Sequence, residues 1–174
     1  AEIHLLHARW LQKQRRPLEP VLKQALTLLA AAQAVNDRRA GTFVTLARVA
    51  KLQAETAAGG EAAAALARGL DSTAKALELS PGSAVALLTQ GQLQLLQALR
   101  APVGERASLA EPALAALSQA LKLNPLLGYE GGAARDRAQE LVNDARNKPA
   151  PGPKGPRAAK AAPGPGLPGD QKKR

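Results

Sequence analysis

The sequence predicts an all-α protein, a helical-repeat solenoid of about three helix pairs that ends in a capping helix and a disordered tail. Ala, Leu, Gln, Glu, Lys and Arg dominate residues 1–147, and these are the residues that most favour helices. No useful length of chain alternates β-branched and polar residues as a half-buried strand does. A short motif also recurs along the chain, which is typical of helical-repeat proteins.

Helix-breaking residues divide residues 1–147 into seven helical segments. Arg15-Arg16-Pro17 ends the first segment, Asn36-Asp37 the second and Gly59-Gly60 the third. Pro81 stops the fourth because proline lacks a backbone N–H, and Ser83 is placed to cap the N-terminus of the fifth. We therefore expect helices near 2–14, 19–35, 39–57, 61–79, 83–99, 109–123 and 132–147.

The last two helices have signals of their own. Ser108 and Glu111 have the spacing of a capping box, and Pro112 is tolerated in the first turn that follows. Pro125 cannot continue the sixth helix. Gly131-Gly132 then precedes the seventh, so we expect a loop up to this pair.

An internal repeat relates the two halves of this region. Residues 76–81 (Ala-Leu-Glu-Leu-Ser-Pro) match residues 120–125 (Ala-Leu-Lys-Leu-Asn-Pro) at a spacing of 44. Alternate helices carry a small residue near their middle, which lets two helices approach closely: Ala8, Ala47 and Gly91. We expect large neighbours such as Leu5, Trp10 and Leu11 to fill the space around it.

The motif Ala-Leu-x-Leu-x-Pro, followed by Gly or Ala about eight positions into the next helix, resembles the tetratricopeptide repeat (TPR). The resemblance covers roughly residues 2–125 as three helix pairs, with residues 132–147 as the capping helix. The small residues are spaced by 39 and 44 positions, which is longer than the usual repeat of about 34. An unrelated helical bundle is the alternative.

A narrower resemblance concerns the end of the array. Residues 124–129, Asn-Pro-Leu-Leu-Gly-Tyr, and the helix after them are similar to the end of the TPR-like region that follows the catalytic domain in some bacterial Ser/Thr protein kinases. That resemblance implies a docking or regulatory region of a larger bacterial signalling protein. The segment itself has no His-Arg-Asp loop, Asp-Phe-Gly motif or Gly-rich phosphate loop, so we expect no enzyme activity from it.

In TPR arrays the first helix of each pair lines a groove that holds a protein or peptide ligand. The resemblance implies these groove positions here: Arg9, Gln12, Lys13, Arg48, Lys51 and Gln92, with Leu95 beside the last. Arg9 and Lys13 are one turn apart, as are Arg48 and Lys51, so four cations could line one groove. Such a groove favours an acidic peptide, whereas the simpler alternative is that these residues form ordinary solvated helix faces.

The formal net charge of +10 is unevenly distributed, because residues 148–174 alone contribute +6. Pro, Gly and Ala fill most of this segment, which is too poor in apolar residues to offset the entropy of ordering. We expect a disordered basic tail. An alternative function follows from it: a basic accessory protein that contacts nucleic acid or anionic surfaces, without reading a base sequence.

Other classes of chemistry find little support. The chain has no cysteine, and no serine lies in a nucleophile elbow. His4 and His7 could face one metal ion, but no third ligand is evident beyond Glu2, so we expect neither a metal nor a cofactor. We also expect no membrane span, and a cytoplasmic location since no signal peptide is visible. The partner and the oligomeric state stay open.

Overall fold

The computed structural model describes residues 1–147, and this part of the chain is all-α, without a strand. The expected number of helices is confirmed there, and a 3₁₀ turn at Pro125–Leu127 joins the last two. The helices are α1 (Glu2–Lys13), α2 (Glu19–Val35), α3 (Ala40–Thr56), α4 (Gly59–Leu79), α5 (Ala84–Arg100), α6 (Arg106–Leu123) and α7 (Gly128–Asn147). The predicted disordered tail, 148–174, lies outside the described residues.

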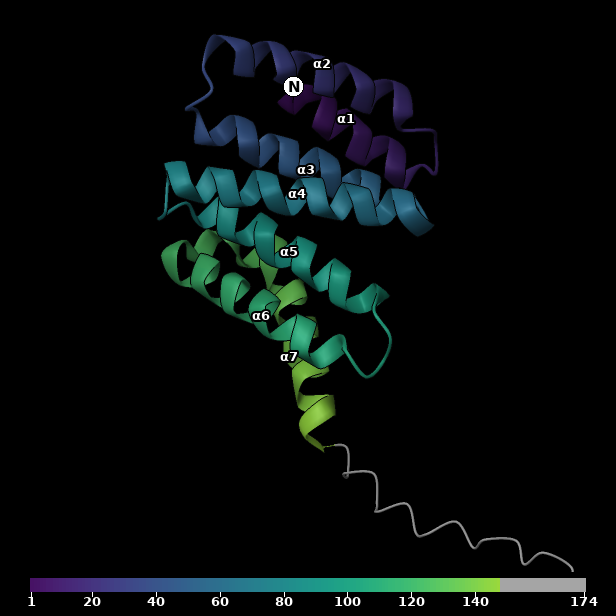
Figure 1. The fold of residues 1–174 in the computed structure, drawn as a ribbon, viewed down its shortest axis with the longest axis vertical. Coiled ribbons are helices and arrows are strands. Elements are labelled where there is room, and N and C mark those ends of the chain that lie inside the picture. Colours follow the sequence, from purple (N-terminus) through teal and green to yellow (C-terminus); the bar gives the residue numbers. More distant parts are fainter. Residues whose placement is uncertain (148–174) are drawn as a thin grey trace, which may run out of the picture.

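Each helix packs against the next one in the chain, and the helix pairs are stacked along the long axis of the molecule, from α1 and α2 at one end to α6 and α7 at the other (Figure 1). The odd-numbered helices also contact one another in series, α1 with α3, α3 with α5 and α5 with α7. Hollows separate the even-numbered helices, one between α2 and α4 and another between α4 and α6. The odd-numbered helices therefore form the tighter, inner layer of the stack.

The apolar core is distributed along the stack in several clusters. One joins α1, α2 and α3 around Leu5 and Leu22. Another joins α3, α4 and α5 around the fully buried Leu93. A third joins α5, α6 and α7 around Leu88 and Leu117. Each boundary between neighbouring helices is thus stabilised by its own apolar contacts.

The predicted small residues are buried in contacts between helices. Ala8 and Ala47 are both 0% exposed. At Gly91, an added Cβ would lie 2.6 Å from Cγ of Leu117 and 3.0 Å from the carbonyl oxygen of Ala113, both on α6. Gly91 confirms the expectation that a small residue permits close helix packing, and the burial of Ala8 and Ala47 is consistent with it.

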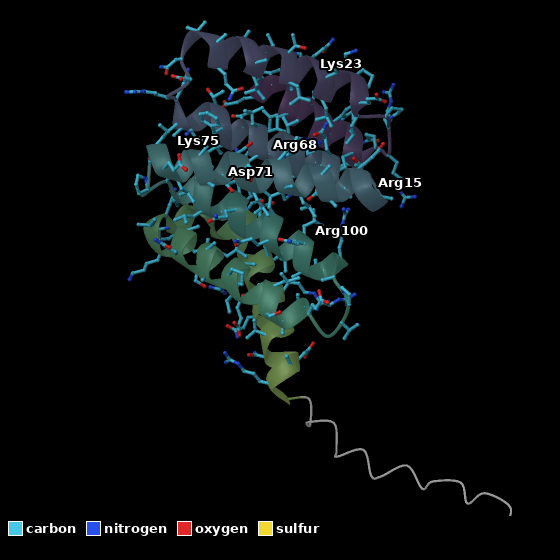
Figure 2. All side chains as sticks on the ribbon, in the orientation of Figure 1. Arg15, Lys23, Arg68, Asp71, Lys75 and Arg100 are labelled. Atoms are coloured by element: carbon cyan, nitrogen blue, oxygen red, sulfur yellow. The ribbon has the colours of Figure 1, made fainter. Side chains whose placement is uncertain are left out.

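Long side chains also hold the inner layer together. The Arg100 guanidinium, at the end of α5, donates hydrogen bonds to the carbonyl oxygens of Ala54 and Ala57 at the end of α3. Figure 2 labels Arg100 about midway along the stack, on the side where α5 ends. The last carbonyl groups of a helix lack partners within that helix, so Arg100 satisfies two acceptors that would otherwise depend on water.

The predicted capping box of the sixth helix is wrong. α6 begins at Arg106, because a turn in which Glu105 N–H donates to the Pro102 carbonyl at 2.9 Å starts the helix early. The Ser108 hydroxyl accordingly donates to the Glu105 carbonyl at 2.9 Å instead of capping. Pro112 lies inside the helix, beyond the first turn.

Two predicted glycine boundaries are also wrong. α4 begins at Gly59, two residues earlier than expected, with Gly59 at a positive φ of 55°. α7 begins at Gly128 and runs through Gly131-Gly132. A Cβ at Gly131 would lie 2.5 Å from Cδ1 of Leu88, so this glycine permits close packing against α5 rather than ending a helix.

Candidate functional site

A cavity of about 590 Å³ lies on the inner layer, and we name it the inner groove. It is lined by Leu6, Arg9, Trp10, Gln12, Lys13, Lys51, Leu52, Glu55, Gln92 and Glu130. Five of the six residues predicted for the ligand groove are in this set, and they come from α1, α3 and α5. The structure therefore brings together side chains that are up to 83 positions apart in the sequence.

Helix α1 contributes the most lining residues to the groove. One face of the helix packs against its neighbours, and another borders the groove. Leu5, Ala8 and Leu11 are buried against the neighbouring helices. Arg9 and Lys13, one turn apart, lie on an adjacent face and border the groove. The apolar spacing that fixes α1 on α2 and α3 thereby fixes the direction of its cationic side chains.

Arg48, the sixth predicted residue, does not line the cavity but lies beside a residue that does. Its guanidinium Nη2 is 3.7 Å from Oε2 of Glu130, which lines the cavity. Its side chain is 26% exposed, so the charge remains partly accessible to solvent. All six predicted residues therefore lie at or beside one site, and their role in binding a ligand stays a prediction.

Two carboxylates in the groove were missed from the sequence. Glu55 Oε1 lies 2.6 Å from Nζ of Lys51, and its Oε2 accepts a hydrogen bond from Gln12 at 3.1 Å. Glu130 Oε1 lies 3.2 Å from Nη2 of Arg9. Glu55 follows Lys51 by one helical turn, a signal the sequence does contain. Glu130 is 121 residues from Arg9, and no local pattern could have paired them.

These acids reduce the positive charge of the groove without cancelling it. The four predicted cations, Arg9, Lys13, Arg48 and Lys51, face two carboxylates. Among residues 1–147 no carboxylate lies within ion-pair distance of Lys13. The groove therefore keeps an excess of positive charge, which attracts anionic ligands over roughly 8–10 Å at physiological salt.

Trp10 and Leu95 correct two sequence predictions. Trp10 does not fill the space between helices: it is 51% exposed and lines the groove next to Leu6. Its helical position is opposite the buried stripe of α1, which the expectation overlooked. Leu95, expected in the groove, is only 7% exposed and packs in the core of α5 and α6. The groove thus has an apolar wall beside its cations.

On spacing alone, the two histidines of α1 are candidate metal ligands. The ring of His7 packs against Trp10, with centroids 6.1 Å apart. Within residues 1–147 no group of three or more His, Cys, Asp or Glu side chains is placed to hold a metal ion. No helix in that range is long and apolar enough to cross a membrane.

No protein-family model, curated protein or solved structure matches the chain.

Proposed function

We propose that residues 1–147 are a TPR-like protein–protein interaction module whose inner groove binds an acidic peptide. The observation that carries the proposal is the convergence of Arg9, Lys13 and Lys51, from two helices, on one groove with a tryptophan in its wall. Cations beside an exposed aromatic ring suit a peptide that carries both carboxylates and a large apolar side chain.

Three features support a repeat array rather than an unrelated bundle. Helices pair in chain order, and the first members of the pairs contact one another in series. Buried small residues recur near the middle of α1, α3 and α5. The core is divided among successive helix boundaries. Arrays of this kind are stabilised by nearest-neighbour contacts and present an extended inner surface.

We further propose that the chain is a docking or regulatory region of a larger bacterial signalling protein, such as a Ser/Thr protein kinase. The resemblance at residues 124–129 supports this, together with α7, which closes the array after the 3₁₀ turn. Leu126 and Tyr129 in that segment are exposed, at 89% and 104%. Neither side chain packs in the core, so both are available to a neighbouring domain or partner.

Charge reversal tests the proposed binding. In the variant Arg48→Glu/Lys51→Glu, two groove cations become anions, so affinity for an acidic peptide should fall by more than about tenfold. The probe is a fluorescein-labelled peptide of alternating Glu and Leu, and its affinity is measured by fluorescence anisotropy. Wild-type binding should weaken as salt is added, since the attraction is partly screened.

The matched control is Lys23→Glu/Arg68→Glu. These two cations line the hollow between α2 and α4, and Figure 2 labels both. The control changes net charge by the same amount outside the inner groove, so its affinity should stay within about twofold of wild type. Equal losses in both variants would show that only net charge matters, and an unchanged affinity of the groove variant would refute the proposal. Circular dichroism checks that each variant is folded.

A further inference from the structure

Glu130 connects the inner layer from one end to the other. Its two carboxylate oxygens face different guanidinium groups, Oε1 at 3.2 Å from Arg9 and Oε2 at 3.7 Å from Arg48. Its backbone carbonyl accepts a hydrogen bond from Nε2 of Gln92 at 3.3 Å. One residue of α7 therefore contacts α1, α3 and α5 through three of the six predicted groove residues.

The carboxylate of Glu130 makes the contacts that a ligand carboxylate would make. Arg9 donates a charge-assisted hydrogen bond to Oε1 of Glu130, and the Arg48 guanidinium lies at ion-pair distance from Oε2, so the carboxylate lies between two cations. The side chains of Glu130 and Arg9 are nevertheless 35% and 36% exposed. Ion pairs with this much solvent contact are weak, worth up to about 1 kcal/mol each, so an external carboxylate can compete.

We propose that Glu130 is an internal competitor that fills the inner carboxylate position of the groove, so that an acidic peptide must displace it. The inference rests on the proposed function. The inference specifies that one acidic side chain of the peptide binds between Arg9 and Arg48. It also implies that α7, through Glu130, lowers the affinity for the peptide. The protein then binds its partner more weakly than the four cations alone would allow.

Glu55 provides the matched comparison. It is the other carboxylate of the groove and carries the same charge. It pairs with Lys51 one turn away on the same helix, and its hydrogen bond from Gln12 is its cross-helix contact. Neutralising Glu55 therefore removes the same charge from the groove while leaving the Arg9 and Arg48 position filled.

The test compares Glu130→Gln with Glu55→Gln in the full chain, using the labelled Glu/Leu peptide. Glu130→Gln should bind the peptide about fivefold tighter than wild type. The peptide then no longer has to displace an ion pair worth about 1 kcal/mol. Glu55→Gln should gain less than about half as much affinity, because it frees one groove cation, Lys51, whereas Glu130→Gln frees both Arg9 and Arg48. Glu130→Ala, which keeps a strong helix former at this position, should reproduce the gain of Glu130→Gln.

A second comparison separates competition from general electrostatics. The Arg48→Gln substitution removes one of the two cations that hold the Glu130 carboxylate. In this background the gain in affinity from Glu130→Gln should shrink by at least about half. An equal gain from Glu130→Gln and Glu55→Gln, unchanged by Arg48→Gln, would overturn the inference. So would unchanged or weaker binding by Glu130→Gln when wild type binds, and in both cases the proposed function would stand. Binding by none of the proteins would refute the proposed function and this inference together.

Discussion

Replacing Gly91 by alanine is expected to lower the free energy of unfolding by about 1–3 kcal/mol, although alanine is the better helix former. The added Cβ would lie 2.6 Å from Cγ of Leu117. Leu117 is 0% exposed, and the contact is to its branch carbon rather than to a freely moving methyl group. The backbone oxygen of Ala113, 3.0 Å away, blocks the other side. Helices α5 and α6 must therefore separate.

Gly132→Ala is the control for this prediction. Gly132 is also inside a helix, but nothing lies within 4 Å of the position its Cβ would take. The substitution should raise the free energy of unfolding by about 0.5–1 kcal/mol, because it removes the entropy cost of a helical glycine. Urea denaturation followed by circular dichroism measures both variants. If Gly91→Ala proves as stable as Gly132→Ala, α5 and α6 do not pack as closely as described.

Leu93→Ala is expected to cost about 3–5 kcal/mol of unfolding free energy, the largest effect of any single substitution considered. Leu93 is 0% exposed and packs with Ala47 of α3 and Leu66 of α4. Gly69 of α4 leaves room for it, since a Cβ there would lie 2.9 Å from both Leu93 methyl carbons. Truncation leaves a cavity at the boundary between the first four helices and the last three.

The comparison for Leu93 is Leu123→Ala on α6. Leu123 is 50% exposed, so its loss should cost less than about 1 kcal/mol. Urea denaturation again gives both values. A difference between the two variants smaller than about 1 kcal/mol would contradict the assignment of Leu93 to the core of this boundary.

Local chemistry explains which helix boundaries the sequence could predict. α4 ends at Leu79, before Ser80-Pro81, and α6 ends at Leu123, before Asn124-Pro125, as expected. These two prolines disfavour continuation of the helix before them, because the missing N–H and fixed φ are properties of the residue itself. Glycine only lowers helix propensity. At Gly131 the contact with Leu88 across the helix boundary outweighs that preference, and sequence position alone does not show it.

The groove could be predicted only in part, because local helical spacing is visible in the sequence but contacts between distant helices are not. Arg9 and Lys13 follow from helical spacing once the buried stripe of α1 is known, and the structure places both at the groove. Glu130 could not be found, because its contacts depend on how α7 folds back over three other helices. Trp10 was misplaced because a large aromatic residue was expected to be buried, whereas its position on α1 faces away from the core.

Trp10 allows the most direct test of the proposed binding groove. It is the only tryptophan in the chain and it lines the inner groove, so its fluorescence reports on that site alone. We would titrate the full chain with an unlabelled Glu/Leu peptide and with its Gln/Leu counterpart. The proposed function predicts a saturable shift of Trp10 emission to shorter wavelength with the acidic peptide, and a much weaker response to the neutral one. Binding of the acidic peptide without any change in Trp10 emission would place the ligand elsewhere and contradict the proposed site.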